Sequence, residues 1–155
     1  MRQIIIKVLL GVVVALGSLN VHAQVKAFEK YADMKNVTYV FISKYMLSMA
    51  GKNATPQVPG VDIKTLANKL SGIQIIHAEN KGAQSKLKSD VKEIMAKDKY
   101  ELLMQMNEDD NKVNIFHHVG KQQSAVIMLV EEDDGVTVMV FSGKFTMDDV
   151  MKMTQ

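Results

Sequence analysis

The chain has 155 residues, with 19 basic and 17 acidic side chains, no cysteine and no tryptophan. Without thiols it forms no disulfide, no thiolate metal centre and no cysteine nucleophile, whatever its compartment. Arg2 is its only arginine, and arginine is the side chain best suited to a two-pronged grip on phosphate. This composition argues against nucleic acid as a partner, because such binding depends on basic contacts to phosphate.

Residues 1–23 read as a secretory signal peptide. The signal consists of the basic residues Arg2 and Lys7, an apolar run over 8–19, and Val21-His22-Ala23 at the positions that a signal peptidase reads. We expect cleavage between Ala23 and Gln24. The apolar run is too short for a membrane-spanning helix, which needs about 20 residues.

The expected mature chain, residues 24–155, is a single domain of ordinary length. Both basic residues of the leader leave with it, so the remaining lysines balance the acidic residues and the net charge is near zero. Since no cysteine is present to carry a lipid, we expect a soluble periplasmic or otherwise exported protein without a stable membrane anchor.

The first half of the mature chain predicts two strands among short helices. In order, we expect a helical lead-in over 28–34, a strand over 37–42, a helix over 43–49, a loop over 51–60, a helix from 62 that Gly72 ends, and a strand over 73–77. β-branched and aromatic residues fill the strands, and prolines mark the loop. Ser43 and Asp62 are placed to cap the helices that follow them.

The second half predicts a long helix, four strands and a final helix. The expected ranges are a helix over 85–99, strands over 100–106, 113–119, 124–130 and 136–141, and a helix after Thr146. The long helix carries an apolar stripe at helical spacing. Thr146 and Asp149 resemble a capping box, and Met147, Val150 and Met151 are expected to pack inward.

This order predicts one α+β domain: a mainly antiparallel sheet with a C-terminal four-strand meander and helices packed on one face. Any parallel crossover should be right-handed. Residues 100, 102, 104 and 106 are expected to share a face, as are 113, 115, 117 and 119. The last two strands are apolar on both sides, so their second face should be covered by further helices, by another subunit, or by an apolar ligand or protein.

Acidic residues fill two turns of the predicted meander, Glu108-Asp109-Asp110 and Glu131-Glu132-Asp133-Asp134. The first and third turns of a meander lie at the same end, so seven carboxylates should gather there, with Lys121 at the opposite end. A weak calcium site or a dock for a basic partner is one interpretation. The spacing lacks the alternation and the glycine of calcium loops, which favours simple solvated turns.

Methionine is frequent, with 12 residues in the chain. The pairs Met104/Met106 and Met151/Met153, together with His77, His117 and His118, fit a soft-metal site, because thioethers suit Cu(I). The same spacings are ordinary core patterning on strands and helices, and adjacent histidines on a strand point to opposite faces. We therefore expect no cofactor and no metal, with copper binding as the alternative.

Catalytic patterns are weak. Ser43-Lys44 suggests a Ser/Lys hydrolase, but adjacent residues rarely face each other and no nucleophile elbow accompanies them. The capping role of Ser43 is the competing interpretation. Glu29/Asp33 and Asp148/Asp149 are better explained as surface or cap carboxylates than as an acid/base pair.

Four segments carry a family resemblance. These are Phe28-x-Lys30-Tyr31, the run 37–42 followed by Ser43-Lys44-x-Met46, Tyr100-Glu-Leu-Leu-Met104, and Gly143-x-Phe145-x-x-x-Asp149-Val150. They resemble a family of small exported bacterial proteins known as domain of unknown function 4252. The resemblance implies an envelope protein of Gram-negative bacteria with no assigned activity and no catalytic residues. Many such relatives carry a lipid-attachment cysteine, which this chain lacks.

Together these observations predict a non-catalytic exported protein that acts as a binding or protein-interaction module. Its partner would be a second copy of the chain, an apolar ligand or another protein on the open sheet face. A copper-binding protein is the alternative, and a hydrolase ranks below both.

Overall fold

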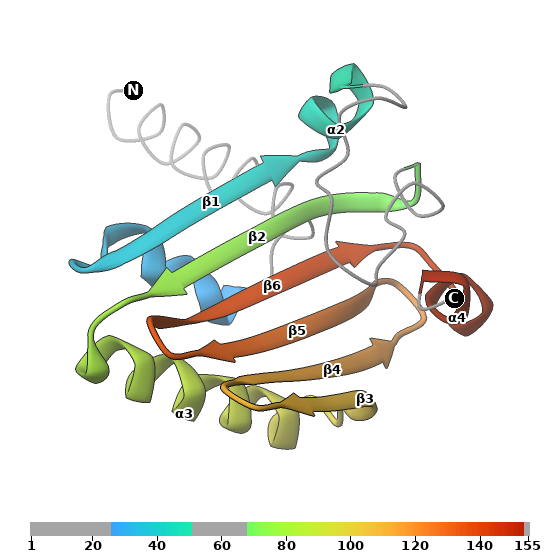
Figure 1. Ribbon diagram of the computed structural model, residues 1–155. Helices are drawn as coiled ribbons and strands as arrows, with labels where there is room; N and C mark the ends of the chain where they lie inside the picture. Colours follow the sequence, from blue (N-terminus) through green and yellow to red (C-terminus); the bar gives the residue numbers. More distant parts are fainter. Residues whose placement is uncertain (1–25, 51–67, 154–155) are drawn as a thin grey trace, which may run out of the picture.

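The computed structural model describes residues 26–50 and 68–153, which form one six-stranded sheet with helices on both sides (Figure 1). The strands are β1 (Val37–Ser43), β2 (Leu70–Ala78), β3 (Glu101–Glu108), β4 (Asn111–Val119), β5 (Ser124–Glu132) and β6 (Gly135–Gly143). Their order is β1-β2-β6-β5-β4-β3, and every neighbouring pair is antiparallel. The predicted α+β fold with a C-terminal meander is confirmed. No adjacent pair of these strands is parallel, so the sheet contains no parallel crossover to which the right-handed rule could apply.

The helices are η1 (Lys26–Asp33), a 3₁₀ helix, then α2 (Lys44–Ala50), α3 (Lys81–Lys97) and α4 (Met147–Met153). α3 carries the chain across the sheet from β2, near one edge, to β3 at the other (Figure 1). It starts four residues before its predicted start because Asn80 caps it, its side-chain oxygen accepting a hydrogen bond from the Ala83 amide at 2.7 Å. Residues 81–84 contain no large apolar side chain that would extend the stripe of Leu87, Val91 and Ile94, so periodicity alone could not reveal this first turn.

η1 and α3 cover one face of the sheet, which we call the first face. Phe28 and Tyr31 of η1 are fully buried there, and Leu87, Val91 and Ile94 of α3 pack against the central strands. The sheet contributes chiefly Ile76, Ala78, Ile127, Leu129, Val136, Val138 and Val140. Each large apolar side chain buried in such a core stabilises the fold by roughly 1.5–3 kcal/mol.

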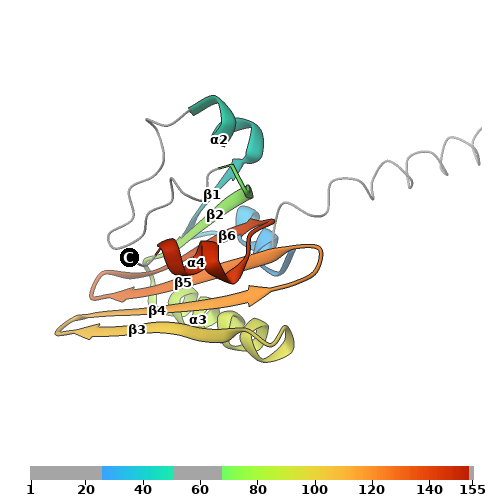
Figure 2. The same ribbon diagram turned by 90° about the vertical axis from the view of Figure 1, so that its right-hand side faces the viewer.

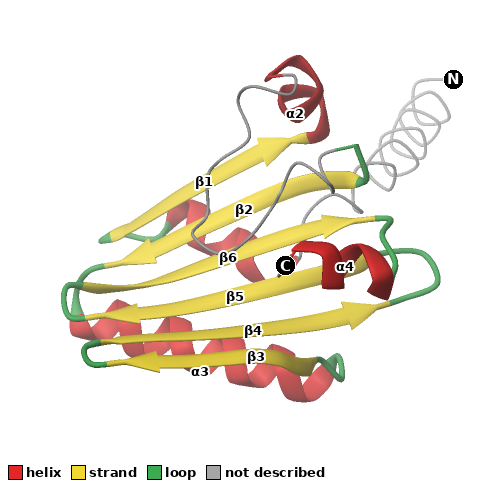
Figure 3. Cartoon of the chain, turned by 45° about the vertical axis from the view of Figure 1, so that its right-hand side comes forward, coloured by secondary structure: helices red, strands yellow, loops and turns green. Residues whose placement is uncertain are grey.

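The opposite, second face carries its own apolar cluster, with α4 lying across the ends of β5 and β6 on the side away from α3 (Figures 2 and 3). Leu47 of α2, Phe145 and Val150 pack there on Ile73, Ile115, Val126, Met128 and Phe141. This cover explains why β5 and β6 are apolar on both sides. The expectation that the helices pack on one face is therefore wrong, because α2 and α4 lie on the face opposite η1 and α3. The expectation that Met147 and Met151 pack inward is wrong, because they are 37% and 52% exposed and only Val150 is buried.

Two irregularities in strands correct the sequence-based expectations. A bulge between Leu102 and Met104 pairs Leu102 with Phe116 and Met104 with Ile115. The extra residue turns Leu102 to the first face, so the expected common face of residues 100–106 is wrong. Gly72 was expected to end a helix, but it lies inside β2 beside another register shift.

The remaining expectations about elements lie outside the described residues. They are the signal peptide over 1–23, its cleavage between Ala23 and Gln24, the loop over 51–60, and the start of the helix after Asp62.

Candidate binding surface

The two acidic turns meet at one end of the sheet, as expected from a meander (Figure 1). Glu131 is paired with Lys88 of α3 at 3.1 Å, and the other six carboxylates of these turns are exposed. Lys121 lies in the connection at the opposite end. Within the described part of the chain, no group of three or more His, Asp or Glu residues is arranged to hold a metal ion. The geometry therefore favours solvated turns.

The three predicted histidine ligands lie apart. His77 on β2 shares a 2.9 Å hydrogen bond between its Nδ1 and Thr137 Oγ1. His117 on β4 is buried, with Nε2 at 3.7 Å from the Glu101 carboxylate and no hydrogen-bond partner for Nδ1 in the described structure. His118 faces the other side, its ring 5.4 Å from that of Tyr100. Two strands separate β2 from β4, so these rings are not gathered into one site.

The methionines form a surface feature that the sequence did not reveal. Of the ten large apolar side chains that stay exposed in the described residues, six are methionines: Met46, Met49, Met104, Met106, Met147 and Met151. The side chain of Met153 lies outside the description. The interpretation of Met104/Met106 and Met147/Met151 as core patterning is therefore wrong. Met104 and Met106 do share one face of β3, but β3 is an edge strand, so little of the chain covers that face. α4 is the last helix, and its methionine side is likewise left uncovered.

One row of residues crosses the second face on all six strands. In strand order it consists of Val40, Ile75, Met139, Met128, Ile115 and Met104. All are apolar. The centre of the row is buried, with Met128 and Ile115 each 4% exposed, whereas its two ends, Val40 and Met104, are 42% and 39% exposed. We call this set the central row.

Ser43 is the cap of α2, since its hydroxyl accepts a hydrogen bond from the Met46 amide at 3.3 Å. This confirms the capping interpretation that competed with a hydrolase nucleophile. Lys44 is exposed on the first turn of the same helix. Glu29 and Asp33 are exposed on η1, and nothing brings them together with another catalytic group.

The predicted capping box of α4 is confirmed. The Thr146 amide donates to Asp149 Oδ2 at 2.8 Å, and the Asp149 amide donates to Thr146 Oγ1 at 3.4 Å. Lys69, just before β2, also donates to this carboxylate at 2.6 Å. The hydrogen bond from Lys69 and then that from the Thr146 backbone lower the pKa of Asp149 to about 2. These contacts fasten α4 to the sheet, whereas the neighbouring Asp148 stays exposed.

A charged node joining η1 to α3 was not predicted. The Tyr31 hydroxyl donates a short hydrogen bond to Asp90 Oδ2, and Lys30 Nζ lies 2.7 Å from the same oxygen. Burial opposes ionisation of Asp90, but hydrogen bonds from Lys30 and Tyr31 outweigh it and lower its pKa. Burial, followed by the bond to Asp90, raises the pKa of Tyr31 well above its usual value. The residues are 59 positions apart, so no local signal connects them.

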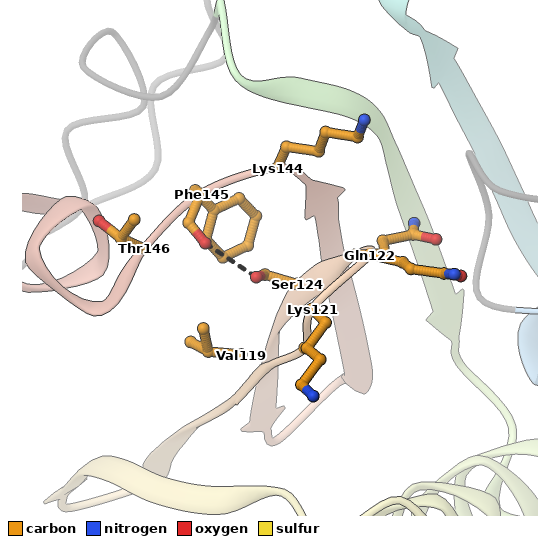
Figure 4. Close-up of a pocket in the computed structure, with 9 residues that line it drawn as sticks. Val119, Lys121, Gln122, Ser124, Lys144, Phe145 and Thr146 are labelled. Carbon is orange, nitrogen blue, oxygen red and sulfur yellow. Dashed lines mark hydrogen bonds between the residues drawn. The ribbon is translucent and has the colours of Figure 1, made fainter.

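Two hollows in the described surface lack the convergent polar groups of an active site. One of about 680 Å³ lies between the β4–β5 connection and the start of α4 (Figure 4). In Figure 4 the Lys121 and Lys144 side chains point away from each other, and the Ser124 hydroxyl donates to the Phe145 carbonyl at 2.8 Å. The other, about 590 Å³, separates α3 from β4 and β5 and is lined mainly by apolar side chains and lysines. Neither hollow assembles a nucleophile, a base and an oxyanion site.

Among the described residues, no helix combines the length and the apolar character needed to cross a bilayer.

The comparisons with known proteins give a family and nothing more specific. No curated protein and no solved structure matches the chain. The family described as Domain of unknown function (DUF4252) matches residues 31–153. The match runs from Tyr31 in η1 to the end of α4 and so covers every strand of the sheet. The chain therefore belongs to the DUF4252 family.

Proposed function

We propose that the chain is an exported, non-catalytic binding protein that holds an apolar segment of a partner protein against the second face of its sheet. The observation that carries the proposal is the exposed apolar rim of this face, which consists of Val40, Met104, Met106 and Met147. The central row is apolar on all six strands, and its ends stay exposed. Around it, Met106 and Met147 are 42% and 37% exposed.

Methionine suits such a surface because its unbranched thioether adapts to partners of different shape. Burying the exposed part of Met104 or Met106 contributes roughly 1 kcal/mol each, since full burial of such a side chain is worth about 1.5–3 kcal/mol. Several of these side chains acting together therefore supply useful affinity without any fixed polar contact. The cluster beneath is buried within the protein, so the partner meets a surface that is already formed.

Two further observations support the non-catalytic and exported parts of the proposal. The serine and carboxylates that sequence reasoning considered for catalysis are used as helix caps or lie alone on the surface. Residues 1–23 have the composition of a secretory signal.

Site-specific crosslinking tests the proposal, using the alternation of β3 as an internal control. A photoreactive benzoylphenylalanine replaces Met106, on the second face, or the adjacent Gln105, which faces the other side. In bacteria that export the protein, we expect a discrete heavier adduct from position 106 and none from position 105. Equal adducts at both positions, or none at 106, would contradict the proposal.

The double variant Met104→Gln/Met106→Gln provides a second measurement. The apolar dye anilinonaphthalene sulfonate should bind the exported protein with enhanced fluorescence, and the variant should lose most of this signal with an unchanged circular dichroism spectrum. A matched pair of substitutions on the exposed helix α2, Met46→Gln/Met49→Gln, should retain it.

Copper binding is the second candidate, favoured by one observation. Met128 and Met139 are direct neighbours on β5 and β6 and place two thioethers on the same face. Calorimetry with Cu(I) measures this directly. The absence of heat at micromolar metal would reject copper, and unchanged dye binding in Met139→Leu would separate the two functions.

A further inference from the structure

The sheet has two free edges, formed by β1 and β3. They are the outermost strands on opposite sides (Figures 1 and 3), and no described strand pairs with their outer sides. The strands have similar lengths, seven and eight residues. Natural edge strands are usually blunted by central charges or prolines. Neither strand has a charged residue or a proline between its ends, and β3 has only the bulge at Leu102/Met104.

Charges of opposite sign flank the two edges. β1 lies between Lys35 and Lys44, and both are exposed. β3 begins at Glu101 and ends at Glu108, which leads directly into the exposed Asp109 and Asp110. The nearest charged residue at each end is therefore basic for β1 and acidic for β3, with Asp33 two residues before Lys35 and Lys99 two residues before Glu101.

The directions of the strands make the two edges compatible. Six strands with antiparallel neighbours place β1 and β3 in opposite directions. A second copy in the same orientation can therefore set its β1 beside β3 of the first and continue the antiparallel pattern. In this arrangement the Lys35 end of β1 meets the Glu108–Asp110 end of β3, and Lys44 approaches Glu101. The first face of one copy then continues into the first face of the next copy.

Pairing between identical edges is disfavoured by the same charges. Two β3 strands paired antiparallel would set Glu101 opposite Glu108 at both ends, and two β1 strands would set Lys35 near Lys44. Like charges opposite each other destabilise a strand pair, and opposite charges stabilise it. Charge therefore selects the mixed pairing of β1 with β3.

We propose that the protein associates head to tail with copies of itself, β1 of one copy adding to β3 of the next. The register with Val40 beside Met104 also sets Thr38 beside Met106 and Lys35 beside Asp109. This register brings Val40 of one copy, which is 42% exposed, beside Met104 of the next copy, which is 39% exposed. Because the two contacting surfaces differ, the association leaves a free edge at each end and can continue. This self-association goes beyond the proposed function, which concerns the face of the sheet.

Sedimentation velocity over a concentration series of the exported protein tests the proposal. The wild-type protein should show a mass that rises with concentration and falls as salt screens the charges. Lys35→Glu should weaken association about tenfold, since it removes one attraction and adds one repulsion, each worth a factor of about two to five. Glu108→Lys/Asp110→Lys should weaken it at least as much. Lys81→Glu, which makes the same charge change as Lys35→Glu at an exposed site on α3, should have no effect.

Mixing the two edge variants gives the decisive result. Lys35→Glu keeps an intact β3, and Glu108→Lys/Asp110→Lys keeps an intact β1. Each variant should fail to associate alone, whereas an equal mixture should regain association, because the two altered edges also carry opposite charges. Strict monomers for the wild-type protein at every concentration would overturn the proposal. So would association that survives unmixed in both variants. Because the proposed register sets Thr38 of a second copy beside Met106, the mass of the crosslinked adduct at position 106 separates the two proposals. An adduct of twice the chain mass reports self-association, whereas an adduct of any other mass reports a different partner protein.

Discussion

Replacing Tyr31 by phenylalanine tests whether the node between η1 and α3 stabilises the fold. The Tyr31 side chain is fully buried, and its hydroxyl donates to the Asp90 carboxylate, whose side chain is only 12% exposed. Phenylalanine keeps the ring and its contact with Phe28, at 6.4 Å between centroids. Lys30 still pairs with Asp90. The substitution therefore removes one hydrogen bond to a charged group and little else.

Hydrogen bonds to charged groups contribute about 1.5–3 kcal/mol. We expect Tyr31→Phe to lower the free energy of unfolding at pH 7 by about 2 kcal/mol, out of a typical total of about 5–15 kcal/mol. With a urea m-value of about 2 kcal/mol per molar, the unfolding midpoint should fall by roughly 1 M. Tyr45→Phe is the matched control, because Tyr45 is 73% exposed and surface changes cost within about 0.5 kcal/mol.

The pH dependence gives a sharper test of the cause. The pKa of Asp90 is lowered in the fold, so its contribution is complete well above the ordinary value of 3.8 and is lost as pH falls below it. The pKa of Tyr31 is raised above the ordinary value of 10.0, so its contribution is complete below pH 10 and is lost as pH rises further. The difference in the free energy of unfolding between wild type and Tyr31→Phe should therefore be largest between about pH 5 and 9, and it should shrink at lower and at higher pH.

Urea unfolding followed by circular dichroism at pH 3.5, 7 and 10.8 measures this difference. Burial also raises the pKa of Tyr100 to about 12, but Tyr100 is present in both proteins and cancels in the comparison. A midpoint at pH 7 unchanged by Tyr31→Phe, or a difference that stays constant at pH 10.8, would refute the reasoning.

Three further outcomes concern the packing of the sheet. Leu87→Ala should cost about 2–5 kcal/mol in urea unfolding, because Leu87 is fully buried between α3 and the first face; a cost below 1 kcal/mol would contradict that packing. Gly143→Ala should lower the melting temperature, since a Cβ there would lie 2.2 Å from the Lys69 carbonyl oxygen, whereas Gly82→Ala, with 3.6 Å to its nearest neighbour, should raise it. Asp149→Asn should lower the melting temperature at pH 7, and the gap to wild type should close as pH falls through 4 toward 2, because the pKa of Asp149 is lowered to about 2; a gap that does not vary with pH would reject the ion pair with Lys69.

Local signals in the sequence predicted the meander and two helix caps correctly, although the local stop signal expected at Gly72 was wrong, because Gly72 lies inside β2. The meander followed from strand composition and short polar turns, and the capping box at Thr146 and Asp149 needed only residues within one helical turn. The Ser43 cap is equally local. The position of both acidic turns at one end followed from the meander alone.

What the sequence left undetermined depends on contacts between distant segments. The bulge between Leu102 and Met104 inserts one extra residue into β3, so Leu102 faces the opposite side of the sheet from Met104 and Met106. Nothing in the local composition marks this bulge. Met104 and Met106 have the alternation of core residues but lie on an edge strand, and only the strand order reveals that. The hydrogen bond from Tyr31 to Asp90 likewise requires η1 and α3 to share a face.

The position of β6 has a consequence for how the protein comes into existence. β6 ends at Gly143, near the end of the chain, yet it lies in the interior of the sheet, with β2 on one side and β5 on the other. Until β6 has been synthesised, β1 and β2 form a two-stranded unit that no other strand of the sheet supports, and such a unit is marginal in water. β1 and β2 therefore cannot join the rest of the sheet before β6 has been made, whereas β3, β4 and β5 are made earlier and pair directly with one another. A truncation before Gly135 removes β6 and so disconnects β1 and β2 from the other strands, which should prevent the six-stranded sheet from forming.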